Sequence, residues 1–285
     1  IIFFAKTAVA QVPPDTISKI NNELQAFKEA DDLEGWLYHR IEYVDVKPTE
    51  RIGFLMQTQQ QAWRSYKSYT ERIAWLYMLA TQGYYQLQSG NILSSIAAYE
   101  NALKFYESYP LPDADVVEYV LKPLGNNYTR LADYNTALFI HQKTLTEATK
   151  KGDRNAIASV YSNMAACSRW KGDLAVAEKF CLQGNEYADR KKLLYGLLLS
   201  TYADILAEQK RYDTAEVVSR QSLQQLKTYG KDMQALYWYT SALQIASRIE
   251  LQRADFAGAT THAQTALNLF DKYYPGLRQR EKAKL

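Results

Sequence analysis

The sequence has few cysteines and histidines, the residues that most often hold metals or act as nucleophiles. Its 285 residues include two cysteines and three histidines. Two cysteines cannot form a disulfide framework. His39, His141 and His262 are scattered without the spacing of metal ligands, so we expect no metal site and no other cofactor. A phosphate-binding loop, a dinucleotide fingerprint and a nucleophile elbow are also missing, which argues against an enzyme with catalytic residues.

An excess of one charge and a long apolar run are both absent. The 34 basic and 31 acidic residues are spread along the chain and leave a formal net charge of +3. Such a balance gives no broad field to attract nucleic acid or a membrane surface. No segment reaches the roughly 20 apolar residues of a membrane span. We therefore expect neither a nucleic-acid partner nor insertion into a membrane.

Glycine and proline are scarce as well, with 12 and 7 copies. The long stretches between them consist mostly of Ala, Leu, Gln, Glu, Lys and Tyr, most of which favour helices. Hydrophobic residues make up 47% of the chain, which is enough for a sizeable core. The composition predicts an all-α protein, in which the 23 tyrosines pack between helices rather than stack on nucleic-acid bases.

One six-residue phrase recurs along the chain. Two small or polar residues are followed by an aromatic or aliphatic residue, two variable positions and a small residue, at residues 90–95, 132–137, 172–177, 210–215 and 254–259. The starting positions are 38 to 44 residues apart. A period of about 40 residues indicates a repeat architecture in which each unit is one supersecondary motif.

Small residues on both sides of each phrase indicate where two helices cross closely. Seven residues before each phrase stands a small residue: Gly83, Gly125, Ala165, Ala203 or Ser247. Apolar residues recur at spacings of three and four on both sides, as amphipathic helices require. Glycine and proline interrupt the pattern between units, at residues 110–113, 151–153, 229–232 and 275–276. Each unit is therefore predicted to be a helical hairpin.

The clearest unit, residues 123–138, contains Leu124-Gly125-x-x-Tyr128 followed nine residues later by Ala137. In this the chain resembles tetratricopeptide-repeat (TPR) proteins. The resemblance covers residues 71–274, as five hairpins, and implies a right-handed α-α superhelix with repeats longer than the usual 34 residues or so. It also implies a concave groove, lined by the first helix of each hairpin, that binds a peptide or protein.

The two ends differ from the repeats. Residues 15–70 are predicted to form a capping helix and a degenerate hairpin, and residues 275–285 a basic tail or linker. Residues 1–14 contain an apolar run that ends in an A-x-A arrangement, Ala8-Val9-Ala10. This is either the remnant of a signal peptide, which would make the protein exported, or a short apolar helix on the first hairpin of a cytoplasmic protein.

The TPR resemblance also implies which side chains line the groove. Positions just before, just after, and four to five beyond the mid-helix small residue carry eight principal candidates: Tyr84, Lys122, Asn126, Arg130, Asn163, Arg169, Trp170 and Asp204. Tyr77, Tyr119, Ser200, Glu208, Gln244 and Arg248 occupy further positions of the same kind. This wall changes from aromatic and basic residues to acidic and mixed ones along the array.

Three of these residues match a carboxylate clamp for an acidic C-terminal peptide, as found in chaperone-binding TPR domains. The resemblance implies that Lys122, Asn126 and Asn163 occupy clamp positions. Their chemistry suits this role, since lysine neutralises a carboxylate and asparagine amides hold a peptide backbone. The two remaining clamp positions, normally basic, fall on Leu197 and Thr201. The sequence thus leaves two alternatives, an acidic-peptide site and a generic groove. Pro123 is expected to kink the helix beside Lys122.

Among TPR proteins, the phrases at residues 122–131 and 158–165 resemble the N-terminal arrays of bacterial CHAT-domain proteins, which precede a caspase- or separase-like protease domain. This resemblance implies a protein-interaction scaffold that serves as the recognition arm of a larger protease. Two other functions stay open: a signalling-peptide receptor, and an extracytoplasmic sensor module of a membrane kinase. A Cys–His catalytic pair is not expected, because a helical array gives His141 no reason to meet Cys167.

Overall fold

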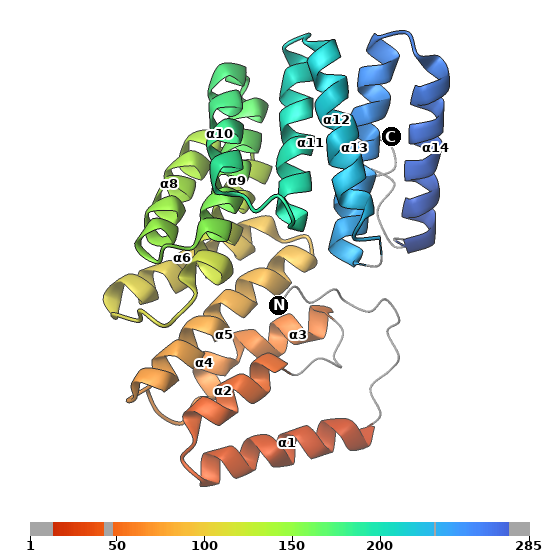
Figure 1. Cartoon of the computed structure of the whole chain (residues 1–285). Coiled ribbons are helices and arrows are strands. Elements are labelled where there is room, and N and C mark those ends of the chain that lie inside the picture. Colours follow the sequence, from red (N-terminus) through yellow and green to blue (C-terminus); the bar gives the residue numbers. More distant parts are fainter. Residues whose placement is uncertain (1–13, 43–47, 231, 274–285) are drawn as a thin grey trace. The chain divides into compact units, whose positions relative to one another are not determined.

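The computed structural model describes residues 14–42, 48–230 and 232–273, and the expectations for residues 1–13 and for the basic tail 275–285 lie outside this part of the chain. The chain divides into two compact units, Ile1–Leu131 and Ala132–Leu285. Each is described by itself. The array predicted for residues 71–274 spans the boundary between them. Figure 1 shows the helices coloured along the chain.

Unit 1 contains seven α-helices and one π-helical turn among its described residues. The elements are α1 (Pro14–Glu29), α2 (Leu33–Glu42), α3 (Pro48–Met56), α4 (Thr58–Gln61), α5 (Tyr69–Gln88), α6 (Ile92–Ser108), the π-helical turn η1 (Val117–Leu121) and α7 (Lys122–Arg130). Helices α5 and α6 pair closely as a hairpin, and α2 and α3 also pack on α5. A capping box between Ser68 and Glu71 begins α5.

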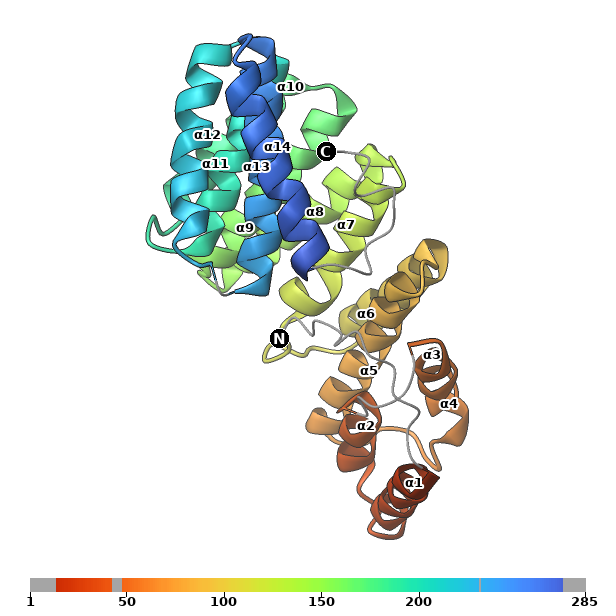
Figure 2. The same ribbon diagram turned by 90° about the vertical axis from the view of Figure 1, so that its right-hand side faces the viewer.

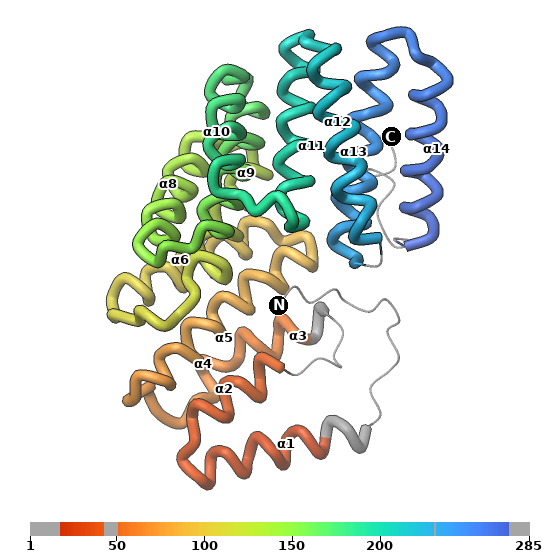
Figure 3. The backbone as a smooth tube through the Cα atoms, in the orientation of Figure 1, coloured from red at the N-terminus to blue at the C-terminus, as the bar shows by residue number. Residues whose placement is uncertain are grey.

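Unit 2 consists of seven helices in its described part: α8 (Tyr134–Lys150), α9 (Arg154–Lys171), α10 (Leu174–Tyr187), α11 (Leu193–Glu208), α12 (Tyr212–Lys227), α13 (Met233–Gln252) and α14 (Phe256–Tyr273). The tube in Figure 3 follows them along the chain. Helices α9/α10, α11/α12 and α13/α14 form the most extensive pairs. In each pair we call the first helix the A helix and the second the B helix. The predicted all-α fold built from helical hairpins is confirmed.

Every recurring phrase begins with a residue in the left-handed backbone conformation. The φ angles are 83° at Gly90, 63° at Ala132, 93° at Gly172, 63° at Lys210 and 60° at Ala254. The following N–H returns to the preceding helix, as from Asp173 N to Ser168 O (2.9 Å) and from Arg211 N to Leu206 O (2.9 Å). This is how a helix is ended by a Schellman motif. The phrase is thus the stop signal of the A helix.

The small residues flanking the phrases lie where helices cross, as expected from the sequence. A Cβ added to Gly83 would lie 2.8 Å from the ring of Tyr99 on the partner helix α6. In the equivalent place of a later hairpin, Ala165 and Cys181 belong to one buried cluster. Gly83, the smaller of the two A-helix residues, is accompanied by Tyr99, the larger of the two B-helix residues, whereas the larger Ala165 is accompanied by the smaller Cys181. The residue sizes compensate for each other, so the space between the crossing helices stays filled.

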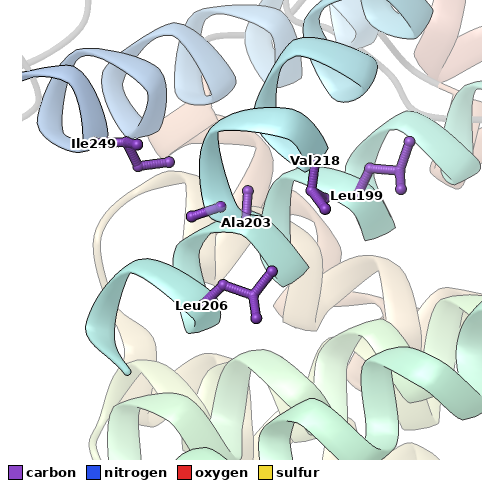
Figure 4. Packing of buried hydrophobic residues seen from close by; sticks show 6 residues of the cluster. Leu199, Ala203, Leu206, Val218 and Ile249 are labelled. Atoms are coloured by element: carbon purple, nitrogen blue, oxygen red, sulfur yellow. The ribbon is translucent and has the colours of Figure 1, made fainter. Parts of the chain in front are cut away.

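The core of unit 2 passes from one hairpin to the next. One cluster joins Leu199, Ala203 and Leu206 of α11, Ala215 and Val218 of α12, and Ile249 of α13. Figure 4 shows these side chains packed together, and Figure 2 shows α11, α12 and α13 side by side. Because α13 belongs to the next hairpin, each hairpin covers the apolar face of its neighbour, as in helical-repeat proteins.

Pro123 is accommodated by a change of helix type, in keeping with the expected kink. The π-helical turn η1 ends immediately before α7, and the N–H of Lys122 bonds to the carbonyl of Val117, five residues earlier. A wider turn moves the backbone carbonyls away from the proline ring, which would clash in a regular α-helix. The helical path therefore continues through Pro123 into α7.

Candidate peptide-binding surface

The A helices of unit 2 are linked by ion pairs across their common face. Helix α11 contacts both α9 and α13. Asp204 of α11 lies 3.2 Å from Nη1 of Arg169 on α9, measured from Oδ2. Its other oxygen, Oδ1, pairs with the guanidinium of Arg248 on α13. Arg169 also pairs with Glu208, one turn further along α11. We call these four residues the wall network; their formal charges sum to zero.

The members of the wall network are unequally exposed. The side chains of Asp204 and Arg169 expose 9% and 14% of their surface, whereas that of Arg248 exposes 55%. Trp170, next to Arg169, is 51% exposed, and the Arg169 guanidinium carbon lies 5.7 Å from the centre of its ring. A molecule approaching this face therefore meets the indole of Trp170 and the guanidinium of Arg248 first.

A second set of polar side chains lies on the same helices as the wall network, one on each A helix. Asn163 precedes Trp170 by seven residues, Thr201 precedes Asp204 by three, and Gln244 precedes Arg248 by four. These spacings place each pair on one helix face. We call Asn163, Thr201 and Gln244 the polar row. All three are partly exposed, and neither amide has a hydrogen-bond partner among the residues that the structure describes.

The polar row offers the chemistry of a peptide backbone binder. An amide carries two N–H donors and one carbonyl acceptor, which match the carbonyl and N–H groups of an extended peptide. The hydroxyl of Thr201 donates to Leu197 O within α11 (3.1 Å), which leaves its oxygen as an acceptor. Unit 2 thus combines backbone-binding groups with a cation and an indole on one face.

The other four principal candidates lie in unit 1. Lys122, Asn126 and Arg130 follow one another at intervals of four residues on α7, so they share one face. The ammonium of Lys122 lies 2.5 Å from Oε2 of Glu118 in the preceding turn, and Arg130 donates to the amide oxygen of Asn127 (3.0 Å). Lys122 therefore already has a carboxylate partner, which the spacing of four residues from Glu118 signals in the sequence.

Tyrosines occupy the adjoining positions of the predicted wall in unit 1. Tyr77 of α5 and Tyr119 of η1 meet edge to face, with ring centres 5.2 Å apart. Tyr84 packs in the same way against Tyr85 at 5.0 Å, and burial raises the pKa of its hydroxyl. The Tyr77 and Tyr119 rings pack between two elements, as the sequence predicts for most tyrosines, whereas Tyr84 and Tyr85 both belong to α5. The candidates for the clamp are divided between the units, with Lys122 and Asn126 in unit 1 and Asn163 in unit 2.

The cysteines and the central histidine are enclosed in the core of unit 2. Cys167 and Cys181 are buried thiols that are not in a disulfide, and burial raises the pKa of the Cys181 thiol to about 12. His141 is completely buried, neither of its ring nitrogens has a hydrogen-bond partner in the described structure, and burial lowers its pKa to about 4. His141 and the Cys181 thiol are therefore uncharged at neutral pH.

The described residues contain neither a metal-binding cluster nor a helix that could cross a membrane. They contain no group of three or more His, Cys, Asp or Glu side chains arranged to hold a metal ion. None of the helices drawn in Figure 1 combines the length and the apolar character that crossing a membrane requires, within the same described ranges.

The sequence placed Arg169 and Asp204 on one wall but did not predict that they pair with each other. It also missed the paired state of Arg248, which it assigned only to the wall. No signal in the sequence gives these pairs, because the residues are 35 and 44 positions apart and their meeting depends on how successive hairpins stack. In the structure, these separately predicted residues are therefore linked by ion pairs on one surface.

Neither a protein-family model nor a functionally curated protein matches this chain. Solved structures do. BtubC from P. vanneervenii superimposes with a TM-score of 0.65 at 14% identity, covering 82% of this chain and 96% of BtubC. The apo quorum sensor NprR from B. thuringiensis gives 0.63 at 16% identity, covering 95% and 74%. NprR in complex with its cognate peptide NprX gives 0.58 at 15%, covering 95% and 83%. The chain therefore has the all-α fold of TPR-like helical-repeat proteins.

Proposed function

We propose that this protein is a protein-interaction scaffold whose unit 2 binds an extended polypeptide segment across α9, α11 and α13. One observation carries the proposal. The amides of Asn163 and Gln244 lie on the helix faces of Trp170 and Arg248 and have no hydrogen-bond partners among the described residues. A polar group that is half-buried and unpaired gains free energy when a ligand pairs with it.

The exposed side chains favour an acidic ligand. The guanidinium of Arg248 has five N–H donors, and its bond to Asp204 uses one nitrogen, so donors are left for a carboxylate of the ligand. Trp170 offers an apolar surface of the kind that often dominates the binding energy of interfaces. A peptide with an acidic group near α13 and an apolar side chain near α9 therefore fits this face best.

The proposal is tested by selecting ligands from a displayed library of random peptides and measuring the affinity of a selected peptide by calorimetry. The double variant Asn163→Ala, Gln244→Ala should bind about tenfold more weakly, because each lost hydrogen bond contributes about 0.5–1.5 kcal/mol. The matched control is Gln142→Ala, Gln221→Ala, which removes two exposed amides from the B helices α8 and α12. Equal affinity of the two double variants would refute the assignment of the polar row.

A second candidate is a signalling-peptide receptor, which the comparisons favour because the same fold carries peptides in two solved complexes. One is NprR with NprX; the other is a Rap protein complexed with competence and sporulation factor (TM-score 0.54, 15% identity). Such a receptor should become more compact when a selected peptide is added. Small-angle scattering checks this, and unchanged dimensions with every bound peptide would argue for a scaffold instead.

A finer proposal is that the repeats form the recognition arm of a CHAT-type protease. Its support is the resemblance of the phrases at residues 122–131 and 158–165, and the role given to this chain is binding rather than catalysis. Sequencing the gene beyond Leu285 tests it, with a His- and Cys-bearing protease domain as the expected result. A membrane-spanning segment there would instead favour a sensor module of a kinase.

A further inference from the structure

Three consecutive basic residues, Arg190, Lys191 and Lys192, connect α10 to α11. We call them the basic loop; it lies where the green ribbon turns to teal in Figure 1. All three side chains are exposed, and none has a carboxylate partner in the part of the chain that the structure describes. Most other described arginines of unit 2 do have one, namely Arg169, Arg211, Arg220, Arg248 and Arg253.

The backbone of the basic loop is held in place by the next hairpin. The amide of Gln225 donates to the carbonyls of Arg190 (3.0 Å) and Lys192 (3.4 Å), and the hydroxyl of Tyr229 donates to the carbonyl of Lys191. An exposed loop with all three carbonyls bonded is ordered before any partner arrives. Binding to it then costs less conformational entropy than ordering a free loop.

A fourth cation adjoins the basic loop. Arg154, at the start of α9, donates through Nη2 to the carbonyl of Glu186 (2.7 Å) and lies over the ring of Tyr187, 5.2 Å from its centre. It too has no carboxylate partner among the described residues. The two described arginines of unit 2 that lack such a partner, Arg154 and Arg190, are therefore both at this surface.

The acidic residues nearby do not neutralise these cations directly. Asp189 accepts the N–H of Lys191 (2.9 Å), and Asp153 accepts the N–H of Ala156 at the start of α9 (2.9 Å). Both carboxylates are thus bonded to the backbone. Their charges weaken the local positive field, but the basic side chains keep their hydrogen-bond donors for an external anion.

We propose that the basic loop and Arg154 form a docking site for an acidic segment, a run of Asp and Glu residues, of a protein partner. The size of the site favours this partner, because four cations match a short run of carboxylates. Nucleic-acid binding proteins typically make six to ten phosphate contacts, and the whole chain carries balanced charge with a net value of +3. The site is separate from the polar row, so it would hold a partner outside the proposed peptide-binding face.

The experiment uses a fluorescein-labelled hexaglutamate peptide, whose binding to the whole chain is followed by fluorescence anisotropy at low ionic strength. The variant Arg190→Ser, Lys191→Ser, Lys192→Ser keeps the carbonyls that accept from Gln225 and Tyr229, so its fold should persist, as circular dichroism checks. Its affinity should fall about tenfold, since exposed ion pairs contribute roughly 0.2–1 kcal/mol each. Added salt should weaken binding to the unchanged protein.

A matched control removes the same charge elsewhere in unit 2. The variant Lys171→Ser, Lys179→Ser, Lys210→Ser should bind hexaglutamate within about twofold of the unchanged protein. An equal loss in the lysine control, or no loss in the basic-loop variant, would overturn the proposal. Tighter binding of duplex DNA or of phosphatidylserine vesicles than of hexaglutamate, lost in the basic-loop variant, would overturn it in favour of another polyanion.

Discussion

Two arginines with little exposure, one in each unit, have different kinds of partner. Arg40 of unit 1 is 1% exposed, and its guanidinium donates to neutral acceptors, among them Thr58 Oγ1 (2.9 Å) and Gln61 Oε1 (2.7 Å). Burial lowers its pKa to about 10. Arg169 of unit 2 is paired instead with the carboxylates of Asp204 and Glu208 at the edge of an exposed face.

The difference follows from the regularity of the two units. Helices α2, α3 and α4 have 10, 9 and 4 residues, too short to be held by helix packing alone, and Arg40 joins them by bonding to Thr58, Gln61 and the carbonyl of Phe54. Helices α8 to α14 have 14 to 20 residues and pack as repeated hairpins. In unit 2, therefore, apolar packing makes the interfaces, and polar side chains are left for the A-helix face.

The largest effect is expected from Arg40→Ala. It removes the guanidinium donor from the buried Thr58 hydroxyl, from Gln61 Oε1 and from the carbonyl of Phe54 and opens a cavity beside Trp36, at a cost of about 3–5 kcal/mol to unit 1. Arg169→Ala, the matched change in unit 2, should cost at most about 1 kcal/mol, because Asp204 keeps Arg248 as a partner. Amide hydrogen exchange in α2–α4 measures the effect of Arg40→Ala, and exchange in α9–α11 measures that of Arg169→Ala. Similar losses of protection in the two variants would contradict the expected difference between the units.

The next effect concerns the pH dependence of unit 2. Burial lowers the pKa of His141 from about 6.5 to about 4. The folded state therefore binds the imidazole proton only at a lower pH than the unfolded state does. His141 therefore contributes stability that is fully present above pH 6.5 and is lost as the pH falls to about 4, a loss of about 3 kcal/mol.

The variant His141→Leu isolates this contribution, because carboxylates titrate in both proteins. Urea unfolding at pH 7, 5.5 and 4 should show a smaller loss of stability in the variant than in the unchanged protein. Removal of two unpaired buried nitrogens should also stabilise the variant at neutral pH. Identical pH profiles would mean that the imidazole finds a partner on protonation.

The size matching at helix crossings predicts a smaller effect in unit 1. Gly83→Ala brings a Cβ to 2.8 Å from the ring of Tyr99 and should cost about 1–3 kcal/mol. The added cost of Gly83→Ala should shrink in a Tyr99→Cys background, which reproduces the combination of Ala165 and Cys181 in unit 2. A double-mutant cycle on unfolding free energies measures this coupling; additive effects would show that the two positions are independent.

The smallest effect is expected at the turns between A and B helices. Lys210 has a φ of 63°, which costs a residue with a Cβ roughly 1 kcal/mol. Lys210→Gly should therefore stabilise the protein by about 0.5–1 kcal/mol, and Gly172→Ala, where φ is 93°, should destabilise it by a similar amount. The midpoints of urea unfolding should rise for Lys210→Gly and fall for Gly172→Ala. A higher midpoint for Gly172→Ala would show that the left-handed conformation does not explain the first residue of the recurring phrase.

Sequence patterns predicted the hairpins well because each rests on local physics. The phrase that marks each hairpin ends the A helix by its backbone conformation, and the small residues before it allow two helices to cross. The sequence was less informative about the site. Asn163 shares a helix face with Trp170, and Gln244 with Arg248, by helical spacing alone, but whether a polar side chain is already paired depends on neighbouring hairpins.

The sequence by itself determined that this protein is a series of helical hairpins, since helix propensity, stop signals and apolar spacing act within some 40 residues. The tertiary structure decided which charges cancel and which face outward. Arg169, Asp204 and Arg248 meet only because α9, α11 and α13 stack in one register. The next hairpin also fixes the backbone of the basic loop through Gln225 and Tyr229. Both outcomes depend on side chains more than 30 residues apart, whose distance no local pattern encodes.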